Sequence, residues 1–186
     1  MTLDPCKTGR RSFLTAAAAA GLVAMSGAAV ASSEPVDPWV TRELYTWEKH
    51  RLATLAEKLN DTLADLPVET RVLPGHLRVR IPASLAYVPG KDALNPDGVA
   101  VLTLVAEKLA DQKRVSVEIV GHHDTRANDY EAYVFTQRRA VAAKSALESR
   151  GISPARLKAT GLGMKFPFTD GGSAENQRIE LIIRPV

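Results

Sequence analysis

The sequence has few of the residues on which metal, redox and hydrolase sites usually depend. Its 186 residues include one cysteine, Cys6, four histidines, and only 5% aromatic side chains. A lone cysteine excludes an internal disulfide framework, a zinc ribbon and a CxxC redox site. The absence of GxSxG and HExxH motifs leaves hydrolase and metalloprotease chemistry without support. We therefore expect no catalytic residues, no cofactor and no metal.

The chain also lacks an excess of charge of one sign. Its formal net charge is only +3, and Lys7, Arg10 and Arg11 against Asp4 supply two of those three charges near the N-terminus. The remaining chain is close to neutral. Because nucleic-acid binding needs a clustered basic face, we expect no nucleic-acid partner.

Residues 1–31 have the pattern of an export signal. The stretch Gly9-Arg-Arg-Ser-Phe-Leu14 resembles the twin-arginine (Tat) signal, in which Arg10, Arg11, Phe13 and Leu14 match the motif. An uncharged, alanine-rich run follows up to a small-residue cleavage site before Ser32. A general secretory signal and a retained membrane anchor are the alternatives. We predict export to the periplasm and a mature chain that begins near Ser32.

A polar linker and an amphipathic helix follow the signal. Residues 39–66 contain neither proline nor glycine, and leucines recur at steps of three and four at Leu52, Leu55, Leu59, Leu63 and Leu66. This stripe packs either on its own domain or against a second chain, as self-association or with another envelope protein. We expect residues 32–70 to form the linker and helix, and residues 71–186 to form one domain.

The remaining pattern predicts alternating strands and helices. Strands are expected at 77–81, 115–121, 156–160 and 178–184, where apolar and polar residues alternate. Helices are expected from the Asn95-Pro96 cap to about 109 and from about 130 to 149. In the first of these, we expect Val99, Leu102, Val105 and Leu109 to be buried. The order β-α-β-α-β-β indicates a two-layer α/β (α+β) sandwich.

The stretch from Gly121 to Ala140, GHHDTRANDYEAYVFTQRRA, resembles the C-terminal peptidoglycan-binding domain of the OmpA-like family. The residues that match that family's motif are Gly121, His122, Asp124, Arg139 and Ala140. The resemblance runs from about 71 to 184 and includes further matches at Leu85-Ala86-Tyr87, Gly151-Ile152, Gly161-Leu162-Gly163 and Asn176-Gln-Arg-Ile-Glu180. Departures occur at Glu131, Ala132, His123 and Met164, where the family has other residues.

The resemblance implies binding of the peptidoglycan stem peptide at a diaminopimelate-type residue. Asp124 and Arg139 would take the amine and the carboxylate of that residue, and further ligand contacts are implied for Thr125, Phe135, Asn176 and Arg178. A carboxylate and a guanidinium complement a zwitterionic head group in charge and in donor count. The alternative is that Asp124 and Arg139 form an ordinary salt bridge between a loop and a helix.

Two further readings concern the histidine pair and the helix. On a continuing strand, His122 and Asp124 share a side and His123 does not, which leaves no third ligand for a metal. The sequence also shows no pair of acid and base residues of the kind that an enzyme acting on peptidoglycan would need. With no catalytic set in view, the resemblance implies non-enzymatic peptidoglycan binding in the periplasm. The alternative is an envelope scaffold that acts through helix 39–66 and whose OmpA-like domain has lost its ligand.

Overall fold

The computed structural model describes residues 43–124, 128–169 and 173–186. The signal motif at Arg10, Arg11, Phe13 and Leu14 and the predicted site residue Thr125 lie outside these ranges. Within them, every helix is too short or too polar to cross a membrane.

A five-stranded sheet forms the centre of the described residues, in the order β1-β2-β5-β3-β4. The strands are β1 (Glu69–Leu73), β2 (His76–Pro82), β3 (Val115–His122), β4 (Leu157–Gly163) and β5 (Arg178–Pro185). Strands β3 and β4 are parallel, and the other neighbouring pairs are antiparallel. The C-terminal strand β5 therefore lies in the middle of the sheet.

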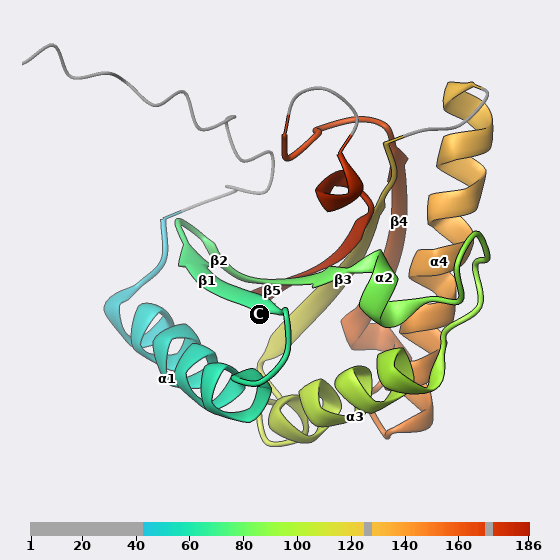
Figure 1. Cartoon of the computed structure of the whole chain (residues 1–186). Coiled ribbons are helices and arrows are strands. Elements are labelled where there is room, and N and C mark those ends of the chain that lie inside the picture. The colour runs from blue at the N-terminus through green and yellow to red at the C-terminus, as the bar shows by residue number, and fades with distance from the viewer. Residues whose placement is uncertain (1–42, 125–127, 170–172) are drawn as a thin grey trace, which may run out of the picture. The chain divides into compact units, whose positions relative to one another are not determined.

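Helices cover one face of this sheet, as Figure 1 shows. They are α1 (Thr46–Leu63), the short α2 (Ala83–Ala86), α3 (Pro96–Ala110) and α4 (Asp129–Ser149). The 3-10 turn Ala174–Asn176, which precedes β5, lies over the opposite face. The two-layer α/β fold expected from the sequence is confirmed.

One apolar core joins the helices to the sheet. Strand residues at alternate positions, including Val79, Ile119 and Leu181, are fully buried on the helix side. Leu52, Leu55 and Leu59 of α1 are fully buried in the same core. The leucine stripe therefore packs on its own chain, which is the first of the two readings offered by the sequence.

The structure corrects three details of the expected elements. Helix α1 begins at Thr46 rather than near 39, since residues 43–45 are not helical and the Glu48 carboxylate accepts the Tyr45 N–H at 2.9 Å. Strand β1 was not expected. In α3, Val99 is exposed rather than buried, whereas Leu102, Val105 and Leu109 lie in the core as expected.

Helix α4 lies close against β3 and β4 because glycines face it. A Cβ on Gly161 would come within 2.5 Å of the Gln137 nitrogen, so only glycine permits this approach. Gln137 then accepts the Gly161 N–H at 2.6 Å, and the Thr136 hydroxyl accepts the Gly163 N–H at 2.9 Å. These bonds fix the first half of α4 relative to the carboxyl end of β4.

Candidate functional site

The guanidinium of Arg139 lies in a pocket of aromatic and backbone groups. Its Nε and Nη2 donate to the Lys91 carbonyl oxygen at 3.0 and 2.9 Å. Its central carbon lies 4.6 Å from the ring centre of Tyr87 and 4.3 Å from that of Phe135. Only 3% of Arg139 is exposed. The cation is thus held in place by contacts with both rings and by paired hydrogen bonds.

Tyr87 also supports the backbone of α4 at this point. Its hydroxyl donates to the Arg139 carbonyl oxygen at 2.8 Å, and the ring is buried. Burial raises the pKa of Tyr87, although the nearby Arg139 charge acts in the opposite direction. The hydroxyl therefore stays protonated and remains a donor at neutral pH.

Asp124 follows the end of β3, and only 5% of its side chain is exposed. Its Oδ1 lies 3.5 Å from His123 Nδ1, and this buried oxygen has no hydrogen-bond partner in the described part of the chain. No ion pair joins Asp124 to Arg139 among the described residues, so the salt bridge that the sequence offered as an alternative is not formed. A buried carboxylate oxygen without a donor is costly.

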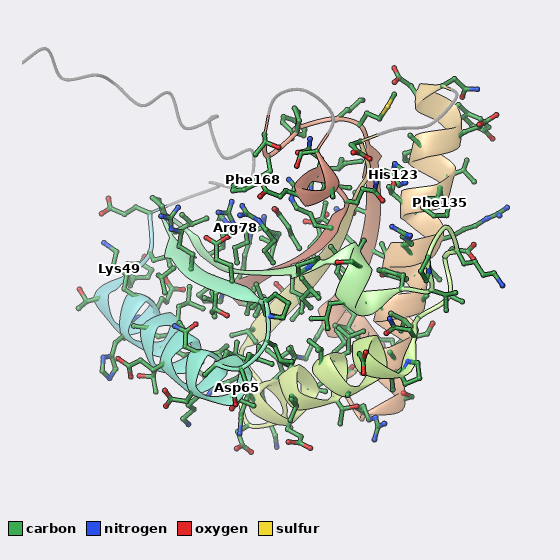
Figure 2. The ribbon with its side chains drawn as sticks, viewed as in Figure 1. Lys49, Asp65, Arg78, His123, Phe135 and Phe168 are labelled. Atoms are coloured by element: carbon green, nitrogen blue, oxygen red, sulfur yellow. The ribbon has the colours of Figure 1, made fainter. Side chains whose placement is uncertain are left out.

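His123 and Phe135 connect these two charged groups. The His123 ring meets the Phe135 ring edge-on, with ring centres 5.2 Å apart, and Phe135 in turn stacks on Arg139. Figure 2 shows His123 at the end of the sheet and Phe135 beside it on α4. Asp124, His123, Phe135 and Arg139 therefore form one continuous row of side chains at the helix-covered side of the sheet.

Strand alternation places the two histidines on opposite faces correctly, but it places Asp124 on the wrong one. His123 lies beside Asp124, whereas His122 points to the opposite face of the sheet, where its Nε2 is 3.8 Å from Glu180. The pairing of β3 with β4 shifts register between Gly121 and His122, and β3 ends at His122. Alternation therefore does not continue into the site.

Two predicted ligand residues lie on that opposite face. Arg178 donates to Glu180 at 2.8 Å and to the carbonyl oxygens of Asn176 and Phe166, both at 3.2 Å. The Asn176 side chain accepts the N–H groups of Phe168 and Thr169 and donates to the Thr169 carbonyl. Both side chains hold the β4–β5 connection in place, and the structure does not bring them to Asp124.

A buried ion network, not expected from the sequence, underlies that connection. Arg80 contacts Glu180 at 3.3 Å and Glu69 of β1, and it stacks on Phe168 with 3.7 Å between the guanidinium carbon and the ring centre. Burial and the Arg178 charge lower the pKa of His122 to about 4. Burial opposes the negative charge of Glu180, but the charges of His122 and Arg178 outweigh it and lower its pKa to about 2.

A metal site has no support in the described ranges. Within residues 43–124, 128–169 and 173–186, no three histidine, cysteine, aspartate or glutamate side chains gather around one point. The histidine pair itself is divided between the two faces of the sheet.

Comparison with known proteins assigns the family. A family model for OmpA matches residues 86–180, which include Asp124, Phe135 and Arg139. The chain belongs to the OmpA family. This OmpA-family chain is 26% identical over 133 residues to YiaD, a probable lipoprotein of Escherichia coli K12. The alignment covers 69% of the chain and 61% of YiaD. It is 30% identical over 96 residues to the outer-membrane lipoprotein YfiB of Pseudomonas aeruginosa. That alignment covers 50% of the chain and 57% of YfiB.

The chain thus spans less than two thirds of the length of these curated relatives.

Solved structures of the OmpA type share its fold. A MotB-like protein of Desulfovibrio vulgaris aligns with a TM-score of 0.66 and 21% identity over 75% of the chain and 98% of that protein. The cell wall anchor of the Pseudomonas aeruginosa T6SS aligns with a TM-score of 0.61 and 21% identity, over 71% of the chain and 97% of the anchor.

Proposed function

We propose that this OmpA-family chain binds the stem peptide of peptidoglycan without catalysis and thereby tethers or organises the cell envelope. The ligand group is the zwitterionic end of a diaminopimelate-type residue. Asp124 takes its ammonium, and Arg139 takes its carboxylate. Membership of the OmpA family and the similarity to envelope lipoproteins support a cell-envelope location.

The buried carboxylate of Asp124 carries this proposal. Its Oδ1 lacks a hydrogen bond among the described residues, although the side chain is almost fully removed from solvent. A bound ammonium group would supply both a charge and N–H donors to this oxygen. The protein thus keeps a group whose desolvation is compensated only when a cation arrives.

Arg139 is suited to the other end of the same head group. The Lys91 carbonyl and the rings of Tyr87 and Phe135 fix the orientation of the guanidinium before a ligand binds. Because a preoriented donor loses little conformational entropy on binding, a carboxylate that reaches it is bound more tightly. His123 stands where the family has threonine, so the imidazole beside Asp124 distinguishes this site from the family pattern.

We also propose that the chain reaches the periplasm by the twin-arginine route, on the strength of Arg10, Arg11, Phe13 and Leu14. The envelope scaffold acting through residues 39–66 is not favoured, because the leucine stripe of α1 is buried in the chain's own core. A partner of this helix would have to contact its opposite, polar face.

The proposal is tested by sedimentation of the protein with purified sacculi. Asp124→Ala or Arg139→Ala should each lower the affinity at least ~30-fold, because loss of one partner of a desolvated charge pair costs about 2–5 kcal/mol. Free diaminopimelate should compete with sacculi for the unaltered protein. Thermal unfolding of Asp124→Ala should show no loss of stability, since the structure gives Oδ1 no bond to lose. Stable variants that still bind sacculi would refute the assignment.

A further inference from the structure

A groove of about 490 Å³ runs between the first turns of α4 and the end of β4. Its walls include Asp129, Tyr130 and Tyr133 from α4, Thr160 from β4, and Met164 and Lys165 from the segment that follows. This volume lies within the range of about 300–1,000 Å³ usual for small-ligand sites. The proposed stem-peptide contacts do not use any of these side chains.

Four of the polar side chains that line the groove have no hydrogen-bond or ion-pair partner among the described residues, whereas the Thr160 hydroxyl donates to Glu118 at 2.8 Å. In the described part of the chain, no hydrogen bond or ion pair engages the Asp129 carboxylate, the hydroxyls of Tyr130 and Tyr133, or the Lys165 ammonium. Tyr130 is 75% exposed and Tyr133 is 49% exposed. Two tyrosines one helical turn apart thus present ring faces and hydroxyls to the same open space.

The wall formed by Met164 and Lys165 is held in one position. Phe166 adopts a left-handed backbone conformation with φ of 57°, and its carbonyl accepts Arg178 Nη2 at 3.2 Å. The Lys165 carbonyl lies 3.4 Å from His122 Nδ1. A strained, anchored segment of this kind is typical of a preorganised binding wall. Arg178 and His122 of the buried ion network thus hold the backbone of this wall of the groove in position.

The chemistry of the groove favours an uncharged, polyhydroxylated ligand. Asp129 and Lys165 carry opposite charges, so the groove selects neither an anion nor a cation. Tyrosine rings and the Met164 thioether accept the apolar C–H faces of a sugar ring, while carboxylate, hydroxyl and ammonium groups bond to its hydroxyls and amides.

The groove also adjoins the stem-peptide site. The Gly163 carbonyl, at the end of β4, accepts the His123 N–H at 2.9 Å, and His123 neighbours Asp124. We infer that the groove is a subsite for the glycan strand of peptidoglycan, formed by neutral N-acetylated hexosamines. This inference rests on the proposed function and adds a second contact with the same polymer. Two linked contacts raise the overall affinity without any change in either one.

The test uses tetra-N-acetylchitotetraose, a glycan that carries no stem peptide, titrated into the full chain by calorimetry. The unaltered protein should bind it, and Tyr133→Ala should weaken binding at least tenfold. Tyr45→Ala, which removes another exposed tyrosine, is the matched control and should bind normally. Asp129→Asn keeps the shape of the groove and should weaken binding several-fold.

Asp124→Ala separates this inference from the proposed function. It should bind chitotetraose as well as the unaltered protein does while losing free diaminopimelate. If chitotetraose does not bind the unaltered protein, or if Tyr133→Ala binds it normally, the glycan subsite is refuted, whatever happens at Asp124. If Tyr133→Ala instead alters self-association in sedimentation velocity without affecting the glycan, the groove is an interface between two copies and the inference is wrong.

Discussion

Arg139 is positioned by contacts that depend on a planar guanidinium and not on positive charge alone. Two of its nitrogens donate to one carbonyl oxygen, that of Lys91, and the group lies against the rings of Tyr87 and Phe135. A lysine ammonium is a compact charge without a plane to stack and without a paired donor geometry. The site should therefore distinguish between the two residues even though their charges are equal.

We predict that Arg139→Lys loses at least tenfold in affinity for sacculi while keeping its charge. Arg138→Lys is the matched control, because the Arg138 side chain is 69% exposed and its nearest carboxylate, on Asp92, is 3.9 Å away. Co-sedimentation at equal protein concentration measures both variants. Equal binding by the two variants would mean that charge alone suffices at position 139, contrary to the geometry.

The buried pair of His122 and Glu180 predicts a dependence of stability on pH. The pKa of His122 is lowered from 6.5 to about 4. Its contribution to the free energy of unfolding is therefore fully present above pH 6.5 and is lost as the pH falls through 4. The pKa of Glu180 is lowered from 4.5 to about 2. Its contribution to the free energy of unfolding is therefore lost as the pH falls from 4.5 to about 2. Each group can change the free energy of unfolding by at most about 1.4 kcal/mol per pH unit.

Urea unfolding of His122→Gln tests this assignment. Between pH 6.5 and 4.5, the free energy of unfolding should fall less steeply for the variant than for the unaltered protein, because glutamine binds no proton. Between pH 4 and 2, where Glu180 is responsible, both proteins should lose stability. An unchanged slope between pH 6.5 and 4.5 would show that His122 is not the responsible group.

The motif predicted the two charged residues of the candidate site but not their surroundings. Asp124 and Arg139 follow from residue type and order, which sequence retains. Lys91 contributes a backbone carbonyl, which any residue could supply, so no side-chain pattern indicates it. The side of Asp124 was assigned wrongly because regular alternation stops where β3 ends at His122, and the end of a strand is set by its pairing and not by the local sequence.

At the scale of elements, strong periodicity predicted the helices and the central strands, whereas short or exposed elements escaped it. Strand β1 has five residues with mixed exposure, and it forms only after the Gly75 turn returns the chain onto β2. Its pattern therefore carries little signal. The leucine stripe of α1 was evident, but whether it packs on its own chain depends on tertiary contacts.

That packing predicts a large effect of a single core substitution in α1. Leu55→Ala should lower the free energy of unfolding by about 2–5 kcal/mol, because the side chain is fully buried in the shared core. Lys58→Ala, on the exposed face of the same helix, is the control and should change it by less than about 0.5 kcal/mol. Chemical denaturation measures both. Equal, small losses would mean that α1 is an independent extension, and a chain that begins near 71 would then fold alone.

At the scale of the whole molecule, the sheet order places a late segment of the chain between two earlier ones. Strand β5, the last element, pairs with β2 on one side and β3 on the other. Until β5 is present, the two halves of the sheet have no central strand and α1 has no complete core. The sheet therefore joins segments that lie far apart in the sequence.

From the signal motif alone, we predict that export depends on Arg10 and Arg11 and that the exported form is already folded. Replacing both arginines with lysine keeps the basic charge but removes the pair that the twin-arginine route requires, so the precursor should stay in the cytoplasm. Arg51→Lys, on α1, is a control that leaves the motif intact and should be exported normally. Cell fractionation shows where the precursor is found, and limited proteolysis shows whether it is folded. A retained precursor that has folded should yield a protease-resistant core. Normal periplasmic delivery of the double variant would assign the signal to the general secretory route, and a protease-sensitive precursor would contradict folding before export.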